Sequence, residues 1–307
     1  MRQPYYIAAG ALPHLRLASL QKRSGRYVIH LFYHTVSDTH LAHITPLYRH
    51  RTTDEFRRDL DWLQQHFTPI RWTEAAAYEA HKQPAFCLTF DDGLREFYDT
   101  VAPILLERKI PCVNFLNSAF IGNADCMYRY KAALIISTLQ QQGKLTNAAR
   151  KHLLSVTYAE RDTLDIIARE AGVDIQGYLQ QQRIYMTYDQ VRELEQQGFE
   201  FGNHSVNHPH YSDLTFAEQL EQTKKCAEEL RKNLSKPTNV FSYPFGQESL
   251  RYEDIDQLCS LYDAVFGTNN LRLGCHPRFY NRIWMEGYRY SARQIIMGEY
   301  LRYLLRR

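Results

Sequence analysis

Two segments of the chain carry side chains that could bind a metal ion and catalyse a hydrolysis. The first, 88–93, has the sequence Leu-Thr-Phe-Asp-Asp-Gly, in which an apolar run ends at two adjacent carboxylates, Asp91 and Asp92. Neighbouring carboxylates repel each other, and a cation is a common reason to keep them together, because one can bind the ion while the other accepts a proton. On its own, this segment is explained equally well by an Asp pair that caps a helix after a strand.

The second segment, 202–209, has the sequence Gly-Asn-His-Ser-Val-Asn-His-Pro and also follows an apolar run. His204 and His208 are four residues apart, a spacing at which two imidazoles can bind one metal ion if the chain is tightly wound. A single histidine is more often structural, but a pair in a chain that also has Asp91 and Asp92 after a strand favours a metal site. We expect Asp92, His204 and His208 to bind one divalent ion, with positions left for water and substrate. Zn²⁺ suits these N and O ligands, and Co²⁺, Mn²⁺ and Ni²⁺ accept them too.

An alternation of short apolar runs and helical patterns predicts the elements that position these side chains. Strands are expected at 27–33, 86–90, 112–116, 199–202, 239–243, 264–266 and 280–284, and helices include 53–66, 97–108 and 216–234. Capping boxes begin at Thr52, Thr187 and Thr215. Alternating strands and helices predict an α/β fold with a parallel sheet, and about seven strands suit an incomplete barrel. Functional groups gather at the carboxyl ends of parallel strands, so both segments should meet at one rim.

The strand pattern stops between about 117 and 185. Helical patterns take its place at 127–142, 148–154 and 160–171. We therefore expect a helical insertion between two core strands, which either caps the site or mediates oligomerisation. The whole chain, 1–307, is expected to form a single catalytic domain that contains this insertion.

Composition excludes several classes of protein. The 37 Lys and Arg residues nearly balance the 34 Asp and Glu residues, with a formal charge of +3 and no long run of one sign, which argues against a nucleic-acid partner or a polybasic membrane surface. No apolar run is long enough for a transmembrane helix, and the first twenty residues lack the apolar centre of a signal peptide. We expect a cytoplasmic protein and leave its oligomeric state open.

The two motifs together, Thr-Phe-Asp-Asp-Gly at 89–93 and His-Ser-x-x-His-Pro at 204–209, resemble those of the polysaccharide deacetylase family, carbohydrate esterase family 4 with its NodB-homology domain. The resemblance extends over roughly 27–284 without the insertion. It implies a distorted (β/α)7 barrel. It also implies that Asp91 is the base, that Asp92, His204 and His208 bind the metal, and that the reaction removes an acetyl group, most often N-acetyl, from a carbohydrate or glycan precursor.

A third motif of the family matches Ser-Tyr-Pro-Phe-Gly at 242–246, and the resemblance implies that the backbone amide of Phe245 holds the oxyanion. Many family members carry an Arg in this motif that orients the base, where this chain has Ser242. We expect Arg282 to replace it, the alternative being a surface or substrate-contacting role. Tyr243 and Trp284, together with Phe245, are candidates for stacking on a sugar ring.

The general acid of the family is usually a late histidine, for which the chain has no clean match. His276 is nearest by position, although an ordinary loop histidine explains it better, and His34, which ends the first strand, is a second candidate that should also face the substrate. Two other functions stay open. The chain could be a catalytically weak relative that binds metal and carbohydrate, or a metal-dependent phosphoesterase. The spare carboxylate of Asp91 favours an enzyme acting on an N-acetylated carbohydrate or glycoconjugate.

Overall fold

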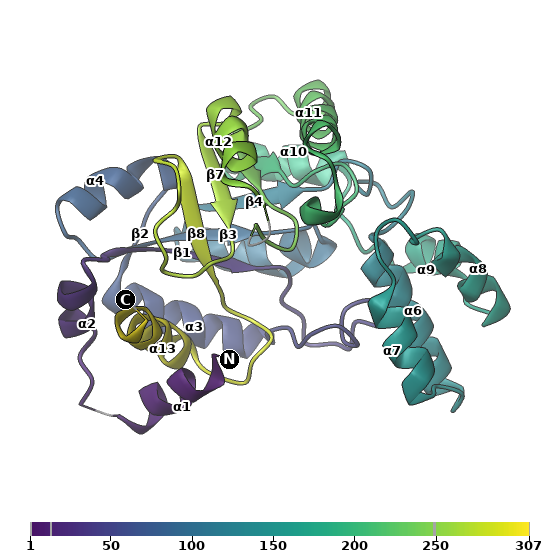
Figure 1. Ribbon diagram of the computed structural model, residues 1–307, viewed down its shortest axis with the longest axis horizontal. Helices are drawn as coiled ribbons and strands as arrows, with labels where there is room; N and C mark the ends of the chain where they lie inside the picture. Colours follow the sequence, from purple (N-terminus) through teal and green to yellow (C-terminus); the bar gives the residue numbers. More distant parts are fainter. Residues whose placement is uncertain (1, 13, 248–249, 307) are drawn as a thin grey trace.

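Seven parallel strands form a closed barrel in the computed structural model, which describes residues 2–12, 14–247 and 250–306 (Figure 1). Around the barrel the order is β1-β8-β7-β6-β5-β4-β3, and β3 pairs again with β1. The strands are β1 (Val28–Tyr33), β3 (Ala85–Phe90), β4 (Cys112–Leu116), β5 (Glu200–Asn203), β6 (Val240–Ser242), β7 (Ala264–Gly267) and β8 (Phe279–Trp284). A short strand, β2 (Thr68–Pro69), adds to β3. The predicted (β/α)7 barrel is confirmed.

The barrel wall is uneven. Strands β1 and β3 pair along their full length, from Val28 with Ala85 to Tyr33 with Phe90. By contrast, β5 and β6 share a single pair, Asn203 with Phe241. The barrel is therefore distorted at the β5–β6 junction.

Helices cover the outside of the barrel (Figure 1). Between the strands lie α3 (Thr53–His66), α4 (Ala75–Ala80), α5 (Ala102–Glu107), α10 (Tyr188–Gln196), α11 (Phe216–Asn233) and α12 (Tyr252–Leu261), with a π-helical turn at Phe97–Val101 that leads into α5. The predicted capping boxes at Thr52, Thr187 and Thr215 all form. In each, the threonine side chain and the residue three positions later satisfy each other's backbone amides, so the helix starts follow from local sequence.

The two ends of the chain meet on one side of the barrel, where α1 (Gln3–Ala11) and α2 (Leu17–Ser24) pack with α13 (Ala292–Leu305) (Figure 1). The Tyr6 hydroxyl donates a hydrogen bond of 2.6 Å to the buried Glu299. Gly298 permits the close approach, because a Cβ there would lie 2.5 Å from the Tyr6 ring. The sequence patterns did not predict these three helices.

Four helices between β4 and β5 form a lobe beside the barrel, and we call residues 117–185 the insertion (Figure 1). They are α6 (Tyr128–Gln141), α7 (Asn147–Ser155), α8 (Thr163–Glu170) and α9 (Ile175–Gln182). Their apolar faces form a core of their own, which also takes in Ile44 and Leu94 from the barrel loops. The insertion is thus packed on the loops at the carboxyl end of the barrel. No helix in the described ranges is both long and apolar enough to cross a membrane, and the cytoplasmic location stays a prediction.

Candidate functional site

The predicted ligands meet at the carboxyl ends of β3 and β5. Asp91 and Asp92 directly follow β3, and His204 directly follows β5. The chain turns sharply at both places, because Asp92 (φ 76°), Ser205 (φ 73°) and His208 (φ 58°) all have left-handed backbone conformations. This conformation is unusual for residues other than glycine and often marks functional sites. The turns bring side chains from two strands into one buried cluster.

Asp92, His204 and His208 offer ligand atoms that all lie within 4.8 Å of one another. Oδ1 of Asp92 is 3.3 Å from Nε2 of His208 and 3.5 Å from Nε2 of His204. All three side chains are buried. The structure therefore brings the predicted ligands together in an arrangement that a single cation can bridge.

The protonation of these side chains fits a metal site. Burial lowers the pKa of His204 to about 4 and that of His208 to about 3, so both imidazoles are neutral near pH 7. Nδ1 of His204 lies 2.8 Å from the backbone carbonyl of Ser242, and as the donor in this bond it leaves the Nε2 lone pair facing Asp92. Oδ1 of Asp92 and Nδ1 of His208 have no hydrogen-bond partner among the described residues, although both are buried. The residues present thus fit a divalent ion.

A tyrosine of the insertion supports one of these ligands. The hydroxyl of Tyr130, on α6, donates a hydrogen bond of 2.7 Å to Oδ2 of Asp92. Both groups are buried. This bond holds Oδ2 and leaves Oδ1 turned toward the two histidines.

Asp91, the predicted base, is held by Arg282. Nη1 of Arg282 donates to Oδ1 of Asp91 at 2.7 Å, and Nη2 donates to Oδ2 at 2.8 Å. Burial alone would raise the pKa of Asp91, but the charge and hydrogen bonds of Arg282 outweigh burial and lower the pKa to about 2. Asp91 is therefore ionised at neutral pH and fixed in orientation.

Arg282 is itself fully buried and fixed on several sides. It donates to the hydroxyls of Thr89 (2.9 Å) and Ser242 (2.6 Å), and its guanidinium lies 4.5 Å from the centre of the Phe32 ring. Ser242, where the resemblance implies an arginine, thus accepts a hydrogen bond from the arginine of β8. The expected pairing of Arg282 with the base is present in the structure.

His34 lines the same pocket and forms an ion pair with the fully buried Glu286 through Nδ1. Glu286 also accepts a hydrogen bond of 2.8 Å from the backbone amide of His34. Burial lowers the pKa of His34, but the charge and hydrogen bond of Glu286, with the charges of Asp92 and Asp91, raise it to about 9. His34 therefore carries a proton at neutral pH.

Phe245 lies at the edge of the cluster, is 38% exposed as a residue and has a left-handed backbone (φ 60°). Its ring is 4.6 Å from the His208 ring and stacks on His210 at 5.1 Å. The backbone N–H of Phe245 has no acceptor within the described part of the chain. This amide is thus available to a ligand, as the third motif implies.

A pocket of about 570 Å³ opens in front of these side chains. Its volume suits one or two sugar units. Trp284 lines it and is half-buried, and its ring lies 6.0 Å from that of Tyr48. Tyr243 also borders the pocket but is only 1% exposed, because its ring packs on Phe241 and Tyr211. The expectation that Tyr243 stacks on a sugar is therefore corrected, since its face belongs to the core.

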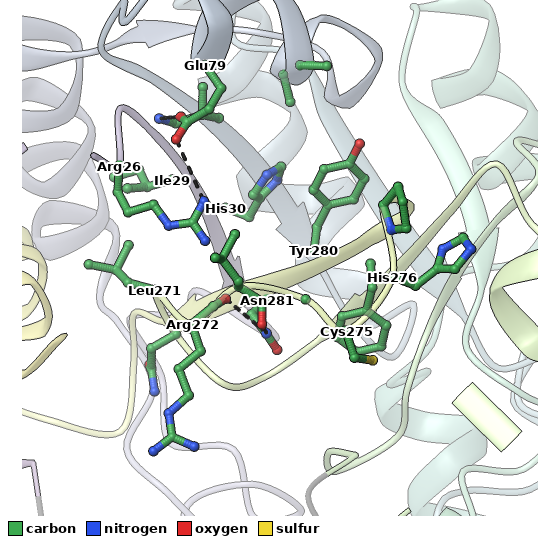
Figure 2. Close-up of a pocket in the computed structure, with 18 residues that line it drawn as sticks. Arg26, Ile29, His30, Glu79, Leu271, Arg272, Cys275, His276, Tyr280 and Asn281 are labelled. Atoms are coloured by element: carbon green, nitrogen blue, oxygen red, sulfur yellow. Dashed lines mark hydrogen bonds and ion pairs between the residues drawn. The ribbon is translucent and has the colours of Figure 1, made fainter. Parts of the chain in front are cut away.

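His276 does not join the cluster. It lines a separate pocket, together with Cys275 and Tyr280 (Figure 2). This pocket is bordered by the first residues of β1 and β8, at the opposite end of the strands from Asp91. None of the described residues lines both pockets. The predicted catalytic role of His276 is therefore not supported, because the barrel lies between it and the metal ligands.

Sequence patterns missed Tyr130, Glu286, Tyr48 and Arg129, which all belong to the pocket or support it. Tyr130 and Arg129 lie in the helical insertion, where no motif singles them out. Glu286 follows Trp284 by two residues, at the end of a predicted strand. That position at the carboxyl rim was a signal that could have identified it.

Comparison with known proteins gives one family match. The family model of polysaccharide deacetylase matches residues 78–261. A search of curated proteins found no significant match.

Several solved structures share the fold. The deacetylase PplD of Streptococcus pyogenes is 17% identical over 89% of this chain and 97% of that chain, with a TM-score of 0.57. IcaB from Ammonifex degensii is 18% identical over 89% of this chain and 97% of its own, with a TM-score of 0.57. A de-N-acetylase from Aggregatibacter actinomycetemcomitans is 16% identical over 83% and 94%, with a TM-score of 0.53. At such identities the likeness establishes the barrel fold.

Proposed function

Because the chain belongs to the polysaccharide deacetylase family, hydrolases that act on amide C–N bonds of acetylated carbohydrates, we propose that it removes an N-acetyl group from a sugar unit. The observation that carries this proposal is the buried cluster of Asp91, Asp92, His204 and His208, with Asp91 fixed by Arg282. We also propose that residues 1–307 work as one catalytic domain, because the insertion supplies Tyr130 to the cluster.

Asp92, His204 and His208 would hold one divalent cation, for which we propose Zn²⁺ on the basis of the N and O ligands. When bound, such an ion polarises the acetyl carbonyl and makes water a better nucleophile at neutral pH. The two neutral imidazoles and the Asp92 carboxylate supply one negative charge to the ion. The site therefore keeps a net positive charge that favours a developing oxyanion.

Asp91 acts as the general base. Its carboxylate is ionised, and Oδ2 lies 4.0 Å from Nε2 of His204, so it stands beside the ligand cluster without being needed as a ligand. It accepts the proton of the water that attacks the acetyl carbonyl carbon. Arg282 binds both carboxylate oxygens and keeps Asp91 in one orientation, which makes it a positioning residue.

The backbone N–H of Phe245 stabilises the negative charge that forms on the carbonyl oxygen. Phe245 has a left-handed backbone conformation and lines the pocket, and its N–H has no acceptor within the described part of the chain. Trp284 offers the aromatic face on which the sugar ring packs.

His34 is the proposed general acid. It lines the pocket, carries a proton at neutral pH and is oriented through Nδ1 by Glu286. Its Nε2–H is therefore available to give a proton to the leaving amine nitrogen as the C–N bond breaks. The arrangement of a histidine with a buried carboxylate partner replaces the expected role of His276.

Acetate release tests this function. Wild-type protein, Asp91→Asn and metal-stripped protein are incubated with a panel of N-acetylated and O-acetylated sugars, mono- to tetrasaccharides, and free acetate is measured. We expect N-acetylated substrates to release acetate with the wild type alone, and Zn²⁺ to restore the stripped protein. If no acetate appears from any substrate while the ligands still bind Zn²⁺, the protein is a binding relative and the proposal is wrong.

A further inference from the structure

Two arginines border the catalytic pocket without a carboxylate partner. Arg129, on α6 of the insertion, and Arg2, before α1, both line it. Neither forms an ion pair with any acidic group in the described ranges. With the Asn270 amide oriented to accept, its oxygen lies 3.2 Å from Nη2 of Arg2 and 3.1 Å from Nη1 of Arg302, and Arg302 is the arginine that pairs with Glu299. No carboxylate of the described residues thus lies within ion-pair distance of either guanidinium, and Arg129 has no acidic partner at all among them.

The charged side chains that line the pocket do not balance one another, because positive charge exceeds negative charge. Asp91 and Asp92 are the only carboxylates among the described residues that line it, and Arg282 compensates Asp91. A divalent cation held by the ligand cluster would more than compensate Asp92, and Glu286 compensates the protonated His34. Arg129 and Arg2 then stand as surplus positive charge in the same pocket. A neutral sugar would leave that charge partly desolvated, whereas an anion would pair with it.

Arg129 is held in place before any ligand arrives. Nη1 donates to the backbone carbonyl of Leu154 on α7, and the guanidinium lies 5.1 Å from the centre of the Tyr128 ring and 5.9 Å from that of Phe245. The Phe245 ring in turn contacts His208, one of the metal ligands. The Phe245 ring therefore lies between the guanidinium and His208, and both side chains line the same pocket. Because these contacts already order the Arg129 side chain, a ligand that binds it loses less conformational entropy, which favours tight binding of a charged group.

We propose that the substrate carries an anionic group, a phosphoryl or a carboxylate, on or next to the acetylated sugar unit, and that Arg129 and Arg2 bind it. This inference rests on the proposed deacetylation. Arginine suits both groups, because its planar fork of donors matches their oxygens. The insertion thus contributes a specificity residue as well as the support for Asp92.

Three substrates test the inference: neutral chitotetraose, N-acetylglucosamine 1-phosphate, and a hyaluronan tetrasaccharide that contains uronate. Their kcat/KM values are compared for the wild type, Arg129→Gln, Arg129→Lys and Arg2→Gln. Arg161→Gln is the matched control, since Arg161 belongs to the insertion but stacks on Tyr158 and does not line the pocket. Thermal unfolding of each variant checks that the insertion remains folded.

We expect the wild type to prefer at least one anionic substrate. Comparison of N-acetylglucosamine 1-phosphate with the hyaluronan tetrasaccharide identifies whether the preferred group is a phosphoryl or a carboxylate. Arg129→Gln should lower the ratio of anionic to neutral kcat/KM by about tenfold or more, the scale of a charge-assisted hydrogen bond. Arg129→Lys should retain part of the preference, and Arg161→Gln all of it. Added salt should weaken the preference as well.

A wild type that cleaves chitotetraose as well as both anionic substrates would overturn the inference while leaving the deacetylase function intact. An unchanged ratio of anionic to neutral kcat/KM in both Arg129→Gln and Arg2→Gln would also overturn the inference. If none of the three releases acetate, calorimetric binding of N-acetylglucosamine 1-phosphate and of the hyaluronan tetrasaccharide separates the two ideas. Binding that Arg129→Gln weakens supports the anion site even when the proposed reaction fails, and absence of binding contradicts it.

Discussion

The Tyr130 hydroxyl donates a hydrogen bond of 2.7 Å to Oδ2 of Asp92, so a helix of the insertion reaches a ligand on the barrel. The bond fixes which carboxylate oxygen faces His204 and His208. Groups that orient metal ligands in this way commonly affect metal affinity as much as activity. The insertion is therefore tied to the site itself.

Tyr130→Phe should weaken metal binding, because the substitution removes one hydroxyl and leaves Asp92 free to rotate. We expect the dissociation constant for Zn²⁺ to rise by about 10- to 100-fold. Competition with a chromophoric chelator measures it without reference to turnover. Tyr178→Phe is the control, since that hydroxyl belongs to the insertion but lies 3.0 Å from His43 instead. Equal affinity in both variants would mean that the bond does not support the ligand.

Arg282→Lys should lower kcat by roughly 100-fold or more, the scale of a general base's contribution. Lysine keeps the buried positive charge but cannot bind both oxygens of Asp91, so the base loses its orientation. Steady-state acetate release gives kcat, while Zn²⁺ content and thermal unfolding show whether the site and fold persist. Arg282→Ala would leave Asp91 unpaired and should cost about 3–5 kcal/mol of stability as well. Unchanged turnover in either folded variant would remove Arg282 from the mechanism.

Glu286→Gln should move the alkaline limb of the pH–rate profile to lower pH. Burial lowers the pKa of His34, and the Glu286 charge is the main effect that raises it to about 9. His34 can donate a proton below its pKa and cannot do so above it. Removal of the Glu286 charge lowers this pKa, so activity should fall at a lower pH. His34→Gln should lower kcat by roughly 100-fold or more at all pH values. A profile of kcat against pH from 6 to about 10 provides the check, and a limb that stays in place would assign the acid elsewhere.

Glu96→Gln should stabilise the protein at alkaline pH. Burial raises the pKa of Glu96 to about 7, above the value of about 4.3 expected in the unfolded chain, and Oε2 is buried without a partner among the described residues. The folded state therefore holds this proton more tightly, and stability falls as pH rises through that window. Chemical unfolding at about pH 4.5 and about pH 8.5 should show a gain for the variant mainly at the higher pH. Glu107→Gln, at an exposed carboxylate, is the control; an equal gain at both pH values would contradict the assignment.

Zn²⁺ should raise the melting temperature of the metal-stripped protein, because the ion binds buried ligand atoms that only the folded state assembles. When free Zn²⁺ is at 100 times its dissociation constant, binding adds about 2.7 kcal/mol to the free energy of unfolding. His208→Gln should lose most of this gain, whereas His276→Gln, in the other pocket, should keep it. Scanning calorimetry at several Zn²⁺ concentrations tests both variants. A gain that His208→Gln retains would place the ion elsewhere.

Local patterns in the sequence predicted the barrel well. The bounds of β4 and α3 were predicted correctly, since a continuous apolar run forms β4 and the Thr52 capping box opens α3. Asp91, Asp92, His204 and His208 were identified because each pair follows a strand, and parallel topology brings such ends together. Arg282 was proposed from its position near the last predicted strand, and its two bonds to Asp91 depend on the register of β8 with β1.

The remaining features depend on contacts between distant parts of the chain. Tyr130 reaches Asp92 through the packing of the insertion, which no periodicity encodes. His276 and His34 are both plausible from their positions in the sequence, and only the closure of the barrel separates their two pockets. Helix α13 was missed although Ser291 and Gln294 form a capping box, because its apolar residues surround the helix instead of lying on one face.

The β5–β6 junction, with its single residue pair, has a consequence for folding and local opening. Backbone ladder bonds are scarce there, and the imidazole of His204 bonds across the gap to the carbonyl of Ser242. The metal ligand His204 thus also links β5 to β6 by a side-chain hydrogen bond. Among the barrel strands, amide exchange should be fastest along this junction and should slow when a cation immobilises His204. We therefore expect closure of the barrel wall at this junction and assembly of the catalytic centre to be coupled.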